Sequence, residues 1–173
     1  MLGQNTDTYR NIRPLIDFII CGSVVCIDPS IGSTSSMPGW AIYRSGELIQ
    51  SGIFTIDPKI RIWEKARELH RNVYNIYKKF KPDILVYEEI PDQNYRQGGA
   101  TGFNVKAHAT LLKAVGAILS VPGTSYAVGL RPIVWKKYVR PEYRKGDKED
   151  AIEIGYAAIQ ISKEIKAEQG RRR

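Results

Sequence analysis

Two short runs of uninterrupted apolar residues limit the folds open to this chain. Residues 24–27 lead into Asp28-Pro29, and residues 84–87 lead into Glu88-Glu89. Runs of this length without polar alternation, rich in β-branched residues, are typical of strands that are buried on both faces. Because helices must then cover the sheet on both sides, the two runs predict an α/β protein.

The rest of the chain supplies the other elements of such a sheet. Residues 40–44 and 48–56 predict two strands joined at Ser45-Gly46, so that three antiparallel strands open the domain. Apolar residues spaced by three and four predict an amphipathic helix over residues 62–80, which ends at Lys81-Pro82. The later segments predict a helix over 105–119, a strand over 125–130, a short helical turn over 132–138 and a last helix over 147–166. This order predicts a five-stranded mixed sheet flanked by helices.

A chain of 173 residues suits one α/β domain and is too short for two ordinary ones. Residues 1–22 are interpreted as an N-terminal extension packed on the domain, with Pro14 breaking any regular element. Residues 23–168 form the predicted domain, and residues 169–173 a solvated basic tail. The apolar stretch over residues 15–27 is shorter than the roughly 20 residues that span a bilayer, and no export signal precedes it. We therefore expect a cytoplasmic protein.

The cysteines, histidines and tryptophans suggest structural roles. Cys21 and Cys26 are the only cysteines, and we expect two buried thiols rather than a disulfide or a zinc site. His70 and His108 each lie alone on a predicted helix, where a packing or surface role is more common than a catalytic one. The three tryptophans are expected to be core or partly buried residues: Trp40, Trp63 and Trp135.

The charge of the chain favours a polyanionic partner. Lys and Arg number 26 against 18 Asp and Glu, which gives a formal net charge of +8. On a small domain this surplus favours nucleic acid as a partner. A basic protein without such a partner would have the same composition, so the charge gains weight only where basic residues surround the chemistry.

Asp28 and Glu88 follow the two buried runs directly. Ligands and catalytic groups in open α/β sheets gather at the carboxyl ends of strands. An Asp-Pro turn and a solvated Glu-Glu pair are the structural alternatives. Because strand side chains alternate, Glu88 continues the buried run and Glu89 faces the opposite way, which favours Glu88 as the functional acid.

Asp147 and Asp150 open the last predicted helix, where acids also serve as caps. Steps of three and four residues from Asp147 lead through Asp150 to an apolar stripe of Ile154, Ala158, Ile161 and Ile165. The two acids therefore head the face that packs on the sheet, whereas Glu149 and Glu153 lie off this line. We expect Asp147 and Asp150 to approach Asp28 and Glu88.

Four carboxylates in a partly dry cleft would raise their own pKa values unless cations were bound. All-oxygen ligands select Mg²⁺ or Mn²⁺ over zinc. Two such ions per site suit in-line hydrolysis of a phosphodiester, with one activating water and the other stabilising the leaving oxygen. The predicted metal and catalytic residues are Asp28, Glu88, Asp147 and Asp150.

These segments resemble the RuvC family of Holliday-junction resolvases in the ribonuclease H-like superfamily. The resemblance runs from about residue 24 to residue 158 and is carried by the two strands ending at Asp28 and Glu88 and by Asp147-x-x-Asp150-Ala151. It implies a ribonuclease H-like fold and a homodimer that resolves four-way DNA junctions by paired nicks, in recombination and repair. The family's four metal-binding acids carry over onto Asp28, Glu88, Asp147 and Asp150.

The chain departs from the bacterial pattern of this family. Ser30 stands where a glycine usually follows Asp-Pro, the turn over residues 31–38 is longer, and an N-terminal extension is present. These differences suggest a divergent branch, of phage or mobile-element type, acting in a bacterium or an infected host cell. They put a preference for a particular cleavage sequence in doubt.

Basic and aromatic residues near the acids are the candidates for DNA contact. Lys and Arg side chains spread along a surface suit contacts to the phosphate backbone, and aromatic rings on a glycine-rich loop after Glu88 suit stacking on unpaired bases. A solvated basic face and a loop whose Phe103 returns to the core are the alternatives. The candidates are Tyr95, Arg96, Phe103, Lys106, Lys136, Lys137, Arg144, Lys145 and Lys148.

Three other functions share parts of this pattern. A flap, fork or RNA/DNA-hybrid nuclease would use the same acids on another substrate. A catalytically silent junction-binding protein would bind without cutting, and the intact set of four acids argues against it. An actin-like or kinase-like relative needs a second domain and glycine-rich phosphate loops, which the sequence lacks.

Overall fold

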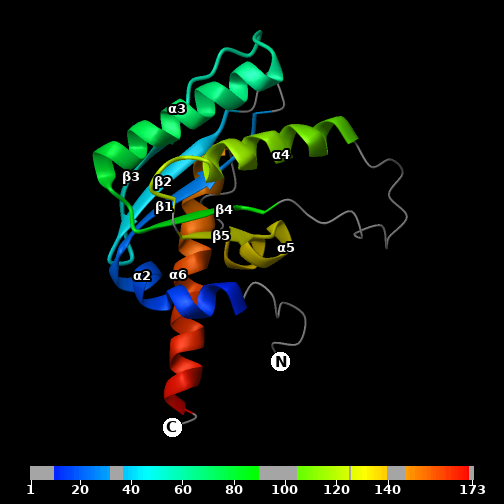
Figure 1. Ribbon diagram of the computed structural model, residues 1–173. Coiled ribbons are helices and arrows are strands. Elements are labelled where there is room, and N and C mark those ends of the chain that lie inside the picture. Colours follow the sequence, from blue (N-terminus) through cyan, green and yellow to red (C-terminus); the bar gives the residue numbers. More distant parts are fainter. Residues whose placement is uncertain (1–9, 32–36, 90–104, 125, 140–146, 172–173) are drawn as a thin grey trace, which may run out of the picture.

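The computed structural model describes residues 10–31, 37–89, 105–124, 126–139 and 147–171 (Figure 1), with the side chains of residues 105–107 and 147–148 left out. The predicted loop residues Tyr95, Arg96 and Phe103, and the basic residues Arg144 and Lys145, lie outside these ranges. None of the helices in the described part is both long and apolar enough to cross a membrane.

A five-stranded mixed sheet forms the centre of the fold, as the sequence predicts. Its spatial order is β3 (Glu47–Ile53), β2 (Gly39–Arg44), β1 (Ser23–Asp28), β4 (Ile84–Glu88) and β5 (Ala127–Leu130). The first three strands are antiparallel neighbours, whereas β4 runs parallel to both β1 and β5. Strand β1 is buried along its whole length, as its uninterrupted apolar run requires.

Helices α3 (Ile62–Phe80) and α4 (Val105–Leu119) cover one face of the sheet. Both helices have the predicted bounds, and the ends of α3 are marked by local signals. At the start of α3 the Arg61 backbone N–H donates to Glu64 Oε2 at 2.9 Å, and the helix ends at Lys81, whose φ is +47°. His70 Nδ1 lies 3.1 Å from Ala117 O, so this histidine joins α3 to α4 as a packing residue.

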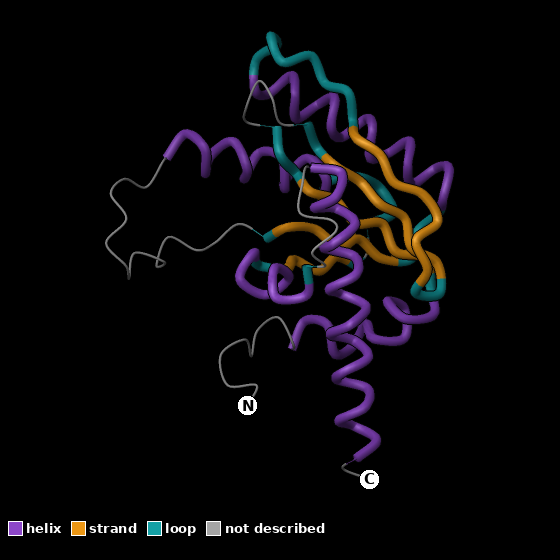
Figure 2. The backbone as a smooth tube through the Cα atoms, turned by 180° about the vertical axis from the view of Figure 1, so that it is seen from behind, coloured by secondary structure: helices purple, strands orange, loops and turns teal. Residues whose placement is uncertain are grey.

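Helix α6 (Asp147–Arg171) lies across the other face (Figure 2), together with η1 (Arg13–Leu15), α2 (Ile16–Cys21), α5 (Pro132–Trp135) and η2 (Lys136–Tyr138). It continues to Arg171, beyond the predicted end at residue 166. The predicted stripe is buried: Ile154, Ala158 and Ile161 have no exposure and Ile165 has 7%. Helix α6 therefore packs on the sheet with the face that its sequence pattern indicates.

Helix α6 comes very close to the sheet at Gly155. A Cβ atom at this position would collide with the ring of Tyr43 and lie 2.6 Å from Cys26 Sγ. The Tyr43 hydroxyl donates to the carbonyl oxygen of Ile152 at 2.8 Å, which ties the same turn of α6 to β2. The glycine allows helix and sheet to approach closely enough for this contact.

The N-terminal segment is more regular than its proline suggests. Pro14 lies at the start of the 3₁₀-helix η1, where its fixed φ and missing N–H are tolerated, instead of breaking the structure. Ile12, Ile16 and Ile19 are buried in the core beneath α6. The residues before β1 thus supply part of the core.

Four other sequence expectations need correction. Cys26 is buried, but Cys21 is an exposed free thiol because it ends the surface helix α2. Trp40 and Trp135 lie in the core, whereas Trp63 is 44% exposed, with the guanidinium groups of Arg61 and Arg67 at 4.6 and 5.3 Å from its ring centre. Strand β3 ends at Ile53, before the buried Phe54 and Ile56, and β5 begins only at Ala127.

Candidate active site

Asp28 and Glu88 end two neighbouring parallel strands at the same level. The β1–β4 register pairs Ile27 with Tyr87, and Asp28 and Glu88 are the next residues of the two strands. Cys26 and Val86, two positions earlier, belong to the core beneath α6. Because strand side chains alternate, Asp28 and Glu88 share the α6 face of the sheet.

Glu89 lies on the opposite side of β4. A Cβ atom at Gly129 would lie 2.9 Å from Glu89 Cβ and 3.2 Å from the Tyr87 ring, so Glu89 and Tyr87 share one side of the sheet. Tyr87 packs against the core under α3 and α4. This alternation follows the facing that the sequence predicts for the two glutamates.

Asp28 is nearly inaccessible, with 2% exposure. The Ser30 hydroxyl donates to Asp28 Oδ1 at 2.9 Å. Buried carboxylates require hydrogen-bond donors, so Ser30 helps to fix the orientation of Asp28. The sequence shows Ser30 only as a replacement for glycine, although a serine two residues after an aspartate often bonds back to it.

Glu88 is half-buried, and its surroundings change its acidity. Burial raises the pKa of Glu88 above its ordinary value, and the charge of Asp150 adds to the rise. The Lys136 ammonium and the Trp135 indole N–H act in the opposite direction. These effects place Trp135 and Lys136, from the segment after β5, and Asp150, from α6, near the Glu88 carboxylate.

Helix α6 begins at Asp147, and Asp150 lies in its first turn, half-buried. Its charge acts on Glu88, so the two carboxylates lie near each other. The side chain of Asp147 lies outside the described residues.

The expected contrast with Glu153 is wrong, since Glu153 is buried with 1% exposure. Helix α6 packs against α2, α5 and η2 as well as the sheet, so its buried surface is wider than the single predicted stripe. Burial alone therefore does not distinguish Asp150 from the other acids of the helix.

The described side chains contain no ready-made group of three Asp, Glu, His or Cys residues that would hold a metal ion. Asp28 and Glu88 nevertheless offer oxygen ligands at adjacent strand ends, and Asp150 raises the pKa of Glu88 from nearby. A hard divalent cation would relieve this repulsion between carboxylates. The donor chemistry thus fits Mg²⁺ or Mn²⁺.

Lys136 and Lys137 are exposed on η2, and Lys136 Nζ lies 5.2 Å from the ring centre of Trp135. Lys106 and Lys148 belong to α4 and α6, and their side chains lie outside the described residues. The segment that follows β5 therefore supplies a basic side chain, Lys136, whose charge acts on Glu88.

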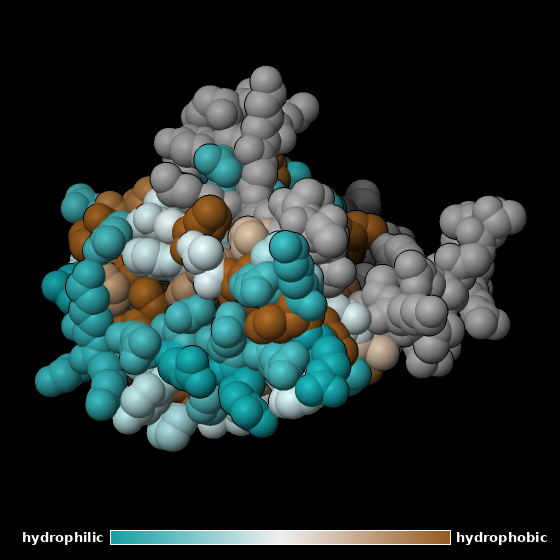
Figure 3. All heavy atoms as spheres, turned by 90° about the horizontal axis from the view of Figure 1, so that it is seen from above, coloured by the Kyte–Doolittle hydropathy of each residue, from teal (hydrophilic) through white to brown (hydrophobic). Residues whose placement is uncertain are grey.

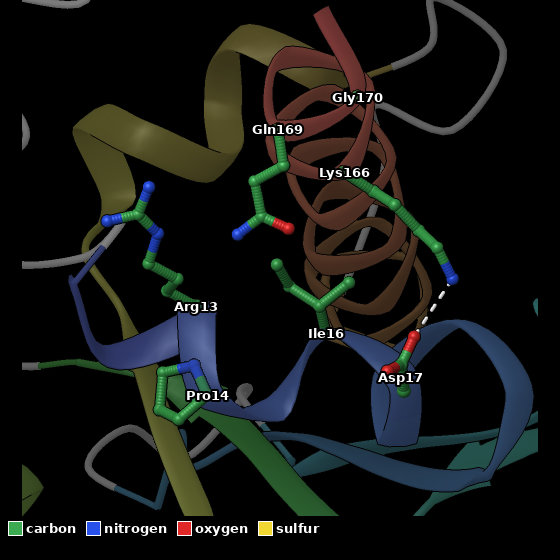
Figure 4. Close-up of a pocket in the computed structure, with 7 residues that line it drawn as sticks. All are labelled: Arg13, Pro14, Ile16, Asp17, Lys166, Gln169 and Gly170. Carbon is green, nitrogen blue, oxygen red and sulfur yellow. Dashed lines mark hydrogen bonds and ion pairs between the residues drawn. The ribbon is translucent and has the colours of Figure 1, made fainter. Parts of the chain in front are cut away.

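A separate hollow of about 440 Å³ lies between the N-terminal helices and the end of α6 (Figure 4). Lys166 Nζ and Asp17 Oδ1 close one side of it with an ion pair of 2.9 Å, and both side chains are largely exposed. The predicted site residues are absent from its lining, which consists of Arg13, Pro14, Ile16, Asp17, Lys166, Gln169 and Gly170.

The sheet order, with helices on both faces, is that of the ribonuclease H-like fold of α/β proteins. No family model and no curated protein matches the sequence. The structure is similar to that of Thermus thermophilus RuvC in complex with a Holliday junction substrate, with a TM-score of 0.57 and 19% identity over 86% of this chain and 96% of that one. A second Thermus thermophilus RuvC structure gives a TM-score of 0.53 with the same identity and coverage. The resemblance found in the sequence is thus confirmed for the fold.

Proposed function

We propose that this protein is a metal-dependent, structure-selective endodeoxyribonuclease that cleaves four-way DNA junctions by paired nicks. The observation that carries the proposal is the position of Asp28 and Glu88, at adjacent ends of β1 and β4 and on the face that α6 covers. Asp150 approaches Glu88 from the start of that helix. Three segments far apart in the sequence thus bring acids to one end of the sheet.

The proposed cofactor is Mg²⁺, with Mn²⁺ as a substitute, at two ions per site. Asp28, Glu88, Asp147 and Asp150 would hold the ions. When bound, the ions would supply an activated water and stabilise the leaving oxygen of the phosphodiester. The chain itself orients Asp28 through Ser30 and keeps both strand-end acids partly shielded from water.

The proposed substrate is branched DNA. Lys136 acts on Glu88 and Lys137 is the next exposed residue of the same segment, where ammonium groups would contact phosphates without reading bases. The similar RuvC structure binds a Holliday junction. The formal net charge of +8 also favours a polyanionic substrate.

Paired nicks require two active sites, so the proposed form is a homodimer. Helix α4 exposes Leu112 (53%) and Leu119 (39%), which lie on the same side of the helix. On the side where α3 and α4 lie, apolar patches interrupt the hydrophilic surface (Figure 3). Association of two copies along α4 would bury these leucines.

The decisive experiment incubates the purified protein with Mg²⁺ and a synthetic four-way junction, a flap, a fork and an RNA/DNA hybrid. Wild type should cut the junction symmetrically, and Asp28→Asn and Glu88→Gln should bind it without cutting. Glu89→Gln is the matched control, because Glu89 faces the other side of β4.

The alternatives give different results in the same assay. Preferred cutting of the flap, the fork or the hybrid would replace the junction as substrate. Tight junction binding without cutting, in either Mg²⁺ or Mn²⁺, would identify a silent binding protein and overturn the nuclease proposal.

A further inference from the structure

Trp135 carries a buried polar atom next to the candidate active site. Its side chain is 1% exposed, and its indole Nε1 is among the buried atoms of the described residues that have no hydrogen-bond partner. An indole N–H can only donate a hydrogen bond. Buried donors without an acceptor are rare in folded proteins, so this group calls for an explanation.

The fold delivers this donor to Glu88. The last residue of β5, Leu130, pairs with Glu88 across the β4–β5 ladder. Helix α5 starts two residues later at Pro132, and Figure 1 shows it beside the end of β5. The backbone N–H of Trp135 donates to Arg131 O at 3.2 Å, which fixes the tryptophan one turn after the strand end.

Glu88 is the acid that the Trp135 N–H influences. The indole N–H favours the ionised carboxylate and lowers the pKa of Glu88, against the rise caused by burial. It still makes no hydrogen bond of normal geometry in this structure.

The geometry points to Trp135 as a positioning residue for Glu88: its indole N–H donates to one carboxylate oxygen and leaves the other oxygen to bind a divalent cation. This assignment rests on the proposed nuclease function. A hydrogen-bond donor to a metal-binding side chain fixes the orientation of that side chain. Loss of such a donor weakens metal binding.

Trp135→Phe removes the N–H while keeping an aromatic ring in the core and beneath Lys136. Trp40→Phe is the matched control, because Trp40 is a buried tryptophan (9% exposed) in the core on the other face of the sheet. Comparison of the two variants separates the loss of the Trp135 donor from the general cost of a smaller buried ring.

The first measurement follows the indole N–H signals of the full-length protein by ¹⁵N NMR without metal. The signal that disappears in Trp135→Phe belongs to Trp135. We expect this signal to move in Glu88→Gln and to stay in place in Glu89→Gln. If the chemical shift of the Trp135 indole signal is the same in Glu88→Gln as in wild type, the assignment is overturned.

The second measurement is calorimetric binding of Mg²⁺ or Mn²⁺. We expect Trp135→Phe to weaken binding about tenfold and Trp40→Phe to leave it close to wild type. In junction cleavage, Trp135→Phe should lower the maximal rate and raise the Mg²⁺ requirement while the affinity for the junction stays constant. Equal behaviour of the two variants would also overturn the assignment.

Failure of the proposed function would look different. Wild type would then cut none of the branched substrates, while the response of the Trp135 signal to Glu88→Gln would still show whether the indole contacts the carboxylate. Normal cleavage by wild type and by Trp135→Phe would instead reject the role of Trp135 alone.

Discussion

Asp28 is the most deeply buried of the candidate carboxylates whose side chains are described, and Ser30 donates to its Oδ1. A glycine at position 30 would offer no hydroxyl to this carboxylate. Ser30 therefore has a role beyond forming the turn after β1. Its hydrogen bond limits the rotation of the Asp28 carboxylate, which must present its oxygens in one direction.

Ser30→Ala tests this role. We expect the cleavage rate to fall at least about tenfold, because the Asp28 carboxylate loses a fixed donor. The stability should fall by only about 1 kcal/mol, the usual net contribution of one hydrogen bond. Rates on a four-way junction and thermal unfolding measure the two effects. Ser45→Ala removes a hydroxyl that bonds Cys21 O far from the acids and should leave the rate unchanged.

Glu88 links the candidate chemistry to stability. Because burial raises its pKa, the folded protein holds the Glu88 proton more tightly than the unfolded chain does. The contribution of Glu88 to stability is therefore fully present below its unfolded-state pKa. It is lost as the pH rises through the higher folded-state pKa.

In the absence of metal, Glu88→Gln should stabilise the protein at neutral pH by about 1 kcal/mol, since the neutral amide avoids a buried charge beside Asp150. The advantage should shrink as the pH falls, because wild-type Glu88 then becomes neutral. Denaturant unfolding in EDTA, from neutral pH downward, measures this difference in stability between the variant and wild type. The exposed Glu47→Gln serves as control, and a Glu88→Gln variant less stable than wild type at neutral pH would contradict the prediction.

At the scale of elements, the approach of α6 to the sheet decides where the helix acids lie. Helix α6 crosses β1 and β2 at Gly155, where the Tyr43 ring and Cys26 Sγ occupy the space that a side chain would need. The start of α6, with Asp150, lies little more than one turn before this crossing. A shift of the helix at Gly155 would therefore move Asp150 relative to Glu88.

Gly155→Ala should destabilise the protein by about 1–3 kcal/mol, because overpacking at this contact outweighs the better helix propensity of alanine. Gly170→Ala lies in the same helix with nothing within 4 Å of the added carbon, so it should be neutral or slightly stabilising. Denaturant unfolding of both variants checks this difference. If Gly155→Ala and Gly170→Ala have equal free energies of unfolding, α6 can move away from the sheet at Gly155 without loss of stability.

At the scale of the whole molecule, the two faces of the sheet differ in the residues that they carry. The α6 face carries the acids, Trp135 and the neighbouring lysines, whereas α3 and α4 complete the second core on the opposite face. The exposed leucines of α4 therefore lie on a helix that packs away from the acids. This division would allow two copies to associate without covering either site.

Leu112→Glu should convert the proposed dimer into a monomer, because it places a charge in a dehydrated apolar contact. Light scattering with size-exclusion chromatography should give twice the 19.6 kDa chain mass for wild type and the single mass for the variant. Ile49→Glu, at an equally exposed position (51%) on β3, should remain dimeric. Dissociation by Ile49→Glu alone would instead place the interface at the β3 edge.

The sequence by itself determined the five strands and the helices α3, α4 and α6, in their order. Periodicity is a local property, so the bounds of α3 and α4 and the strands ending at Asp28 and Glu88 follow from neighbouring residues. Alternation along β4 also determined that Glu88 and Glu89 face opposite sides. The same reasoning predicted the sheet class and a shared end of the sheet for two of the acids.

Only the tertiary structure decided what surrounds those acids. The donors near Asp28 and Glu88, the burial of Glu153 and the core role of Ile12, Ile16 and Ile19 depend on how distant segments pack together. A hydrogen bond or a buried surface requires two groups that meet in space. A local sequence pattern describes one of these groups and does not identify the distant segment that supplies the other. The position of Trp135 beside Glu88 results from the β4–β5 pairing and the turn into α5, which no local pattern around either residue contains.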